Sequence, residues 1–147
     1  PAQVRRGMSA LAPHRSATPE DLDWARTLFR AVGQVVELHE DLIDAFTGVA
    51  GSGPAYIFLL AEALAEAGVA VGLDPDDAAI VARATVAGAG ALLDADDRPA
   101  DELRRAVTSK GGTTAAALDA FEKGDLRGLV ERAVTAARDR GRELGAG

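Results

Sequence analysis

Apolar residues recur every three or four positions along most of the chain, which is the spacing of amphipathic helices, so the sequence predicts a mainly α protein. The first such stretch runs from about Pro19 to Val32. Thr18 is placed to cap this helix, proline suits its first helical position, and Gly33 ends it.

Shorter apolar runs flank that helix and predict extended structure. Ala2 to Pro13 is expected to form an extended segment or a weak edge strand, and Gln34 to His39 a short strand that contains Val35 and Val36. Residues 1–40 are therefore expected to hold one small α/β element, and the rest of the chain to be helical.

Beyond residue 40 the pattern predicts a series of helices separated by glycine, proline and capping residues. The GVAGSGPAY stretch, Gly48 to Tyr56, is expected to break the first of these helices from the second, with Ser52 as the cap of the second. Asp74 and Asp125 are placed to cap later helices. The expected helices cover about residues 41–50, 53–71, 75–94, 99–106, 113–123 and 126–144.

The second of these helices is apolar almost all round, with Tyr56, Phe58, Leu60 and Leu64 spread over its circumference. A helix of this kind is buried in a folded protein. The helix after it carries small residues that permit close packing. Covering both helices is more than one small chain can easily do, so we expect a homodimer or a higher homo-oligomer.

Charge and composition exclude several functions. The chain has 16 Lys and Arg against 23 Asp and Glu, a net charge of −7, which disfavours binding to nucleic acids and to anionic lipid surfaces. It has no cysteine, which excludes disulfides, thiol nucleophiles and thiolate metal sites. Glu62 and Glu66 interrupt the longest apolar stretches, so no membrane span is expected. There is no signal-peptide pattern, and the start at Pro1 suggests a fragment or a processed product.

The most informative segment for chemistry is VTSKGGTTAAALDAF, from Val107 to Phe121. Hydroxyl residues and a glycine pair stand just ahead of an alanine-rich helix. Glycines let the backbone turn tightly, and the first N–H groups of a helix have no partner within it and carry partial positive charge. The segment therefore predicts a site for a small carboxylate with a neighbouring polar nitrogen. The alternative is an ordinary helix start after a glycine turn.

Other motifs give weaker signals. GVAGSG lacks the G-x-G-x-x-G spacing of a dinucleotide loop, and a close crossing of two helices is the better interpretation. Lys110 precedes the glycines, so no P-loop is present. His14 and His39 are far apart in the sequence and are expected at the surface or an edge, and the acidic cluster from Asp94 to Asp97 is expected to be a solvated helix end. No metal site is expected.

Three segments taken together, GSGPAY at 51–56, AGVAVGL at 67–73 and VTSKGGTTAAAL at 107–118, resemble the C-terminal domain of pyrroline-5-carboxylate reductase. PAQVRRGMSAL at the start is similar to the family's crossover from its nucleotide-binding domain, and the last helix also matches. The resemblance implies a helical dimerisation bundle, the C-terminal half of a Rossmann-type reductase. Residues 1–40 would be a crossover remnant of the nucleotide-binding domain, and residues 41–147 the dimerisation and substrate domain.

The family reduces 1-pyrroline-5-carboxylate to proline with NADP or NAD as cofactor, in the cytoplasm. The resemblance implies that Ser109, Gly111, Gly112 and Thr113 bind the substrate carboxylate. Thr114 would be the catalytic residue, its hydroxyl near the ring nitrogen to orient the imine.

The cofactor would be bound mainly by an N-terminal domain that this chain lacks, with Pro1 near the nicotinamide, so the chain alone is expected to be inactive. Three departures from the family pattern stand out: Lys110 in place of a frequent proline, Ala50 in place of serine, and a helix from Pro99 that is one residue longer. Two alternatives stay open. The chain could be a noncatalytic helical dimerisation module, or the equivalent domain of a related Rossmann dehydrogenase.

Overall fold

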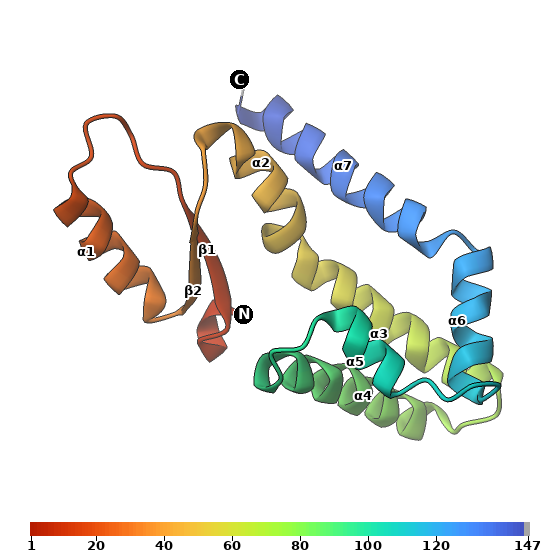
Figure 1. Cartoon of the computed structure of the whole chain (residues 1–147). Helices are drawn as coiled ribbons and strands as arrows, with labels where there is room; N and C mark the ends of the chain where they lie inside the picture. Colours follow the sequence, from red (N-terminus) through yellow and green to blue (C-terminus); the bar gives the residue numbers. More distant parts are fainter. Residues whose placement is uncertain (146–147) are drawn as a thin grey trace. The chain divides into compact units, whose positions relative to one another are not determined.

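The computed structural model describes residues 1–145 and confirms a mainly α protein with one small parallel sheet. The chain divides into two compact units (Figure 1). The first consists of Pro1–Pro54 together with the chain from Glu131 onward, and the second of Ala55–Val130. Each unit is described by itself.

The first unit begins with a β-α-β element, preceded by the 3₁₀ turn η1 (Ala2–Val4). Strands β1 (Gly7–Leu11) and β2 (Gly33–Glu37) pair in parallel, and helix α1 (Pro19–Arg30) connects them and packs beside the pair (Figure 1). The edge strand expected between residues 2 and 13 is thus confirmed as β1. Strand β2 begins one residue earlier than expected and ends at Glu37.

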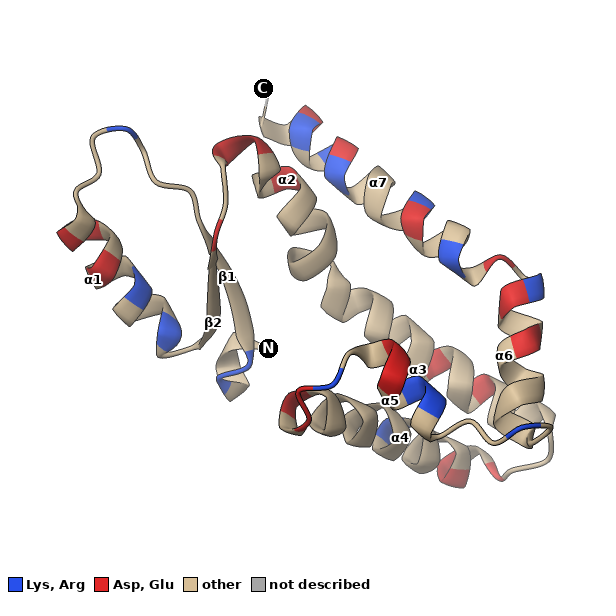
Figure 2. Ribbon diagram, viewed as in Figure 1, with Lys and Arg blue, Asp and Glu red and all other residues tan. Residues whose placement is uncertain are grey.

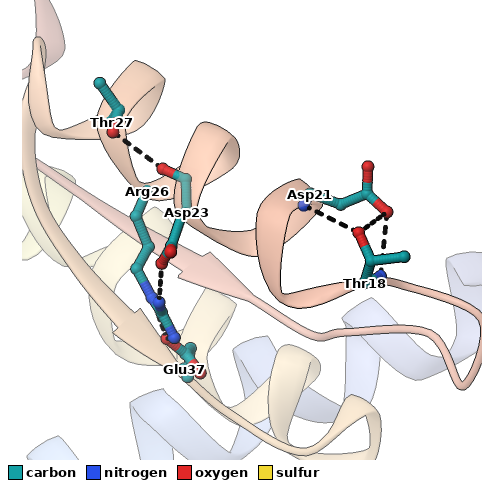
Figure 3. Close-up of polar contacts among 6 residues, drawn as sticks. All are labelled: Thr18, Asp21, Asp23, Arg26, Thr27 and Glu37. Atoms are coloured by element: carbon teal, nitrogen blue, oxygen red, sulfur yellow. Dashed lines mark hydrogen bonds and ion pairs between the residues drawn. The ribbon is translucent and has the colours of Figure 1, made fainter.

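Two side-chain clusters fix α1 (Figure 3). At its start, the Thr18 hydroxyl accepts a hydrogen bond from the Asp21 N–H at 3.2 Å, and the Asp21 carboxylate accepts one from the Thr18 N–H at 2.9 Å, so the predicted cap is a full capping box. Further along, Arg26 forms ion pairs with Asp23 and with Glu37 of β2. The helix is therefore tied to the strand that follows it.

A nearly continuous helical run follows from Glu40 to Ala70. It comprises η2 (Glu40–Leu42), α2 (Ile43–Phe46), the π-helical turn η3 (Thr47–Gly51) and α3 (Gly53–Ala70). The helices separate at Ser52 and α3 begins at Gly53, as expected, but a π turn takes the place of an open break. The expected cap at Ser52 is wrong, because this residue has helical backbone angles of φ −85° and ψ −23°. A π turn admits an extra residue without ending the helix.

Gly48, in that π turn, is buried where the first unit's part of α7 (Leu126–Gly145) passes close by. A β-carbon at Gly48 would lie 3.0 Å from the carbonyl oxygen of Val134 and 3.3 Å from the backbone nitrogen of Arg138. The expected close crossing of two helices is therefore confirmed for this glycine.

The second unit contains α3 from Ala55, α4 (Pro75–Ala95), α5 (Ala100–Ala106), α6 (Thr113–Lys123) and the first turn of α7. Both predicted caps are present. The Asp74 carboxylate accepts a hydrogen bond from the Asp76 N–H at 2.9 Å, and the Asp125 carboxylate accepts one from the Gly128 N–H at 3.2 Å. The boundaries of α6 are those the sequence predicts.

The described chain buries few apolar side chains. Among its residues, only Ala78, Ala82 and Leu103 are buried hydrophobics. Phe58 and Leu59 of α3 are each 64% exposed, and Ile80 of α4 is 66% exposed. Long stretches of α3 and α4 carry no charge (Figure 2). The apolar helix that the sequence predicts to be buried is thus uncovered in the single chain.

Two helical runs, Glu40–Ala70 and Pro75–Ala95, are long and apolar enough to cross a membrane by length and composition. Glu62 and Glu66 therefore do not exclude a span by this criterion, contrary to the expectation from the sequence. Two such helices are weak evidence for a membrane protein, because core helices of soluble proteins pass the same test. What they establish is a large apolar surface that some other surface must cover.

We predict that Thr18→Ala lowers the free energy of unfolding by about 1 kcal/mol, since it removes the N-cap of α1. Urea denaturation of the protein measures this. Thr27→Ala is the matched control, because the Thr27 hydroxyl only donates to the Asp23 carbonyl of its own helix. Equal losses in both variants would contradict the role of the cap.

The capping box also makes the stability of α1 depend on pH. Hydrogen bonds from the Thr18 backbone and side chain lower the pKa of Asp21 below its ordinary 3.8. The charged form is favoured in the folded state, so the stabilising effect is full above that ordinary value and is lost as the pH falls through the lowered one. Thr18→Ala removes the side-chain hydrogen bond but keeps the larger backbone one, so it should flatten the acid side of the stability profile only in part.

Candidate functional site

A tight turn precedes α6 in the second unit. The Gly112 N–H donates to the Ser109 carbonyl at 3.1 Å, with Lys110 and Gly111 as the two central residues. Gly111 has φ +73°, the left-handed conformation that the third position of a type II turn requires. Glycine adopts this conformation at little cost, which is why it stands here. The predicted glycine turn is therefore confirmed in its local geometry.

Gly112 has no side chain, and this leaves room for the Ser109 hydroxyl. A β-carbon there would lie 2.3 Å from the Ser109 hydroxyl oxygen, so any larger residue would push that hydroxyl away. Gly112 is also the N-cap residue of α6, and no side chain caps the helix. Its own N–H is used in the turn, so the donors left for a ligand are those of the first helical residues, from Thr113 on.

Three hydroxyls surround this helix start. Ser109 and Thr113 are exposed and Thr114 is half-buried. Within residues 1–145, none of these three hydroxyls takes part in a hydrogen bond. Free hydroxyls next to free N–H groups, at the positive end of an 11-residue helix, form an arrangement that suits a small anion.

The turn is anchored to the helix before it. The Thr108 hydroxyl donates to the Arg104 carbonyl of α5 at 2.6 Å, and Leu103 of the same helix is buried. The sequence analysis missed Thr108 in this role. The signal was available, because a threonine four residues after a helical residue often bonds back to its carbonyl.

Pro1, the predicted cofactor contact, lies in the first unit. Its carbonyl accepts hydrogen bonds from the N–H groups of Val4 and Arg6 in the turn η1. The residues of the turn and of the α6 start belong to the second unit. The contact between Pro1 and a nicotinamide therefore stays a prediction.

The two histidines belong to the first unit. His14 and His39 are exposed, and both line one hollow of about 700 Å³ at the carboxyl ends of β1 and β2. Each histidine contacts one polar side chain: Ser16 bonds His14 at 2.8 Å and Asp41 pairs with His39 at 3.2 Å. Among residues 1–145, no group of three potential ligands could hold a metal ion.

The acidic cluster has a structural explanation. Asp96 pairs with Arg98 at 2.7 Å, and hydrogen bonds from Arg98 lower the pKa of Asp96 to about 2. The carboxylate is thus neutralised by its neighbour just beyond the end of α4.

The described chain is a helical domain in which two apolar helices are uncovered and the start of α6 has no capping side chain. The family described as pyrroline-5-carboxylate reductase dimerisation matches residues 40–144, and the chain belongs to this family.

Relatives of known name agree. The pyrroline-5-carboxylate reductase of Mycobacterium tuberculosis is 46% identical over 160 residues, covering 97% of this chain and 54% of the relative. The pyrroline-5-carboxylate reductase of Synechocystis is 44% identical over 145 residues, covering 99% of this chain and 54% of the relative. The chain spans about half the length of the curated relatives it matches, their C-terminal part.

Solved structures give the same fold. The reductase of Coxiella burnetii has a TM-score of 0.91 at 39% identity and covers 96% of this chain and 53% of its own. The Plasmodium falciparum enzyme, solved with NADP bound, has a TM-score of 0.85 at 29% identity. The match covers 99% of this chain and 58% of that enzyme's chain. The alternative of a related dehydrogenase is set aside by these matches.

The turn makes a prediction of its own. Gly111→Ala should lower the free energy of unfolding by about 1 kcal/mol, since a β-carbon strains the left-handed conformation. Lys110→Pro should raise it by up to about 1 kcal/mol, because proline suits the second position of a type II turn. Chemical denaturation of the two variants checks this, and equal effects of the same sign would contradict the assigned turn.

Proposed function

We propose that the protein to which this chain belongs reduces 1-pyrroline-5-carboxylate to proline, and that the chain supplies the substrate site and the homo-oligomer interface. The observation that carries the proposal is the start of α6, where free hydroxyls and N–H groups gather beside a glycine turn. Membership of the reductase family supports it.

The substrate carboxylate would accept hydrogen bonds from the Ser109 hydroxyl and from the N–H groups of Thr113 and Thr114. Charge-assisted bonds of this kind are stronger than neutral ones, and the helix dipole favours the negative charge. Gly111 and Gly112 keep the approach open, because neither carries a side chain that would cover these donors.

Thr114 would orient the imine. Its hydroxyl can donate to a neutral ring nitrogen or accept from a protonated one. A neutral hydroxyl is too weak an acid to be the net source of the proton on the ring nitrogen. Water must supply this proton, or the imine must already be protonated. The role of Thr114 is therefore to hold the C=N bond in a reactive orientation, which can account for a large share of a rate enhancement.

NAD(P)H would supply the hydride, and the described residues do not by themselves fit it. The loop from Ala12 to Thr18 that leaves β1 contains no glycine, so it cannot form the glycine-rich phosphate turn of a dinucleotide-binding domain. We therefore infer that residues outside this chain hold most of the cofactor. Residues 1–40 would be the crossover from that domain, with Pro1 at the junction.

The interface would cover α3 and α4. Between these helices lies an apolar groove of about 630 Å³, lined among others by Phe58, Ala65 and Ile80. A second copy of the chain is the proposed cover, since the matched family is described by its dimerisation and both helices fall within residues 40–144. The same cover would account for two helices with the hydropathy of membrane spans in this chain.

In the complete enzyme, we predict that Thr114→Ala lowers kcat by at least tenfold, since the imine loses its orienting hydroxyl. Ser109→Ala should instead raise KM for the substrate by roughly tenfold, because it removes one charge-assisted hydrogen bond to the carboxylate. Steady-state kinetics with each variant measures both.

Thr27→Ala is the control for these variants, because that hydroxyl is bonded within α1 of the first unit. A thermal melt establishes that each variant is folded. If Thr114→Ala folded normally and kept the wild-type kcat, Thr114 would have no part in the mechanism.

The interface is tested by Phe58→Asp, which puts a charge on the exposed apolar face of α3. We expect it to convert the oligomer into smaller species at micromolar concentration, since a buried unpaired charge is costly. Light scattering reads out the mass. Val4→Asp, an exposed residue outside the matched region, should leave the mass unchanged. An unaltered mass for Phe58→Asp would place the interface elsewhere.

A further inference from the structure

We propose that Lys110 captures the anionic substrate, as a specificity-determining residue at the tip of the turn before α6. This inference rests on the proposed function, because it takes the carboxylate to bind at the Ser109 hydroxyl and the first N–H groups of α6. It adds a charged group to a site otherwise made of hydroxyls and backbone.

The basic residues of the second unit fall into two sets. One set pairs with neighbouring carboxylates: Arg98 with Asp96, Arg105 with Asp101, Lys123 with Asp119, and Arg127 with Glu122. The other set, within residues 55–130, forms no ion pair and consists of Arg83, Arg104 and Lys110. Of these three, Lys110 lies in the turn itself and Arg104 lies in α5, the helix before it.

The net charge of the second unit bears on the role of these unpaired basic residues. Acidic residues clearly outnumber basic ones in the second unit, so its overall field repels a carboxylate. Basic residues lie at the end of α5 and, beyond an uncharged stretch of chain, in the turn leading to α6 (Figure 2). The ammonium of Lys110, which forms no ion pair, would offset this repulsion at the turn where the substrate carboxylate binds.

The turn places Lys110 well for this purpose. It is the second residue of the turn whose first residue is Ser109, so the two Cα atoms are about 3.8 Å apart. The Lys110 side chain is exposed, and its flexible four-carbon stem lets the ammonium sweep over the neighbouring donors. The carboxylate would then lie within about one Debye length of the charge at 0.1 M salt.

Arg104, in α5, holds the turn through its backbone. Its carbonyl accepts the Thr108 hydrogen bond that anchors the turn, while its half-buried guanidinium has no ion pair within the described second unit. Lys110 is the better test, because changing it leaves this anchor in place.

The test uses the complete enzyme and compares kcat/KM for 1-pyrroline-5-carboxylate at low and high salt. Lys110→Gln should lower kcat/KM about threefold at roughly 0.05 M salt, mostly through KM, and Lys110→Glu about tenfold. Both deficits should shrink to less than about twofold at roughly 0.5 M salt, where charges are screened. Lys110→Arg should stay close to wild type.

Two further variants separate charge from folding. Lys110→Pro keeps the turn and removes the charge, so it should behave as Lys110→Gln does. Lys123→Gln removes a lysine that pairs with Asp119, and it should leave kcat/KM unchanged at both salt concentrations.

A Lys110→Gln enzyme with wild-type kcat/KM, or with a deficit that does not depend on salt, would overturn the role of Lys110. If Ser109→Ala still raised KM in that case, the proposed function would be kept and only the role of Lys110 would be rejected. If neither Ser109→Ala nor Lys110→Gln altered KM, both proposals would fall.

Discussion

The constraint on which the rest of this structure depends is the need to cover the apolar faces of α3 and α4. The described chain buries few side chains of its own, and Phe58 and Ile80 remain mostly exposed. Apolar surface of this extent is not stable in water, so the fold is complete only when another surface meets it. A second copy would supply that surface, in agreement with the dimerisation family to which the chain belongs.

The proposed site follows from backbone geometry more than from ionisable groups. A left-handed Gly111 closes the turn, the absence of a side chain at Gly112 leaves room for the Ser109 hydroxyl, and α6 begins without a capping side chain. The turn uses the Gly112 N–H, whereas the other two features leave the Ser109 hydroxyl and the first N–H groups of α6 without a partner in the described chain. In the proposed function the chain binds and orients a small imino acid, while the reducing equivalent comes from a cofactor that other residues hold.

Much of the fold was predictable from local signals. Thr18, Asp74 and Asp125 cap the helices that their sequence positions indicate, because capping depends on residues within one turn. The π turn at Thr47–Gly51 was not, since glycines predict a break and the local pattern does not show that Gly48 lies against Val134 and Arg138 of α7. The sequence also located the loop from Ser109 to Thr114. It did not show that the Gly112 N–H is used within the turn, which depends on the turn type.

The central claim is that the start of α6 binds the substrate carboxylate. A crystal structure of the complete enzyme with proline bound tests it most directly. The account predicts the carboxylate within about 2.7–3.2 Å of the Ser109 hydroxyl and the Thr113 N–H, with the ring nitrogen facing the Thr114 hydroxyl. Proline bound elsewhere, with these donors facing only solvent, would contradict it.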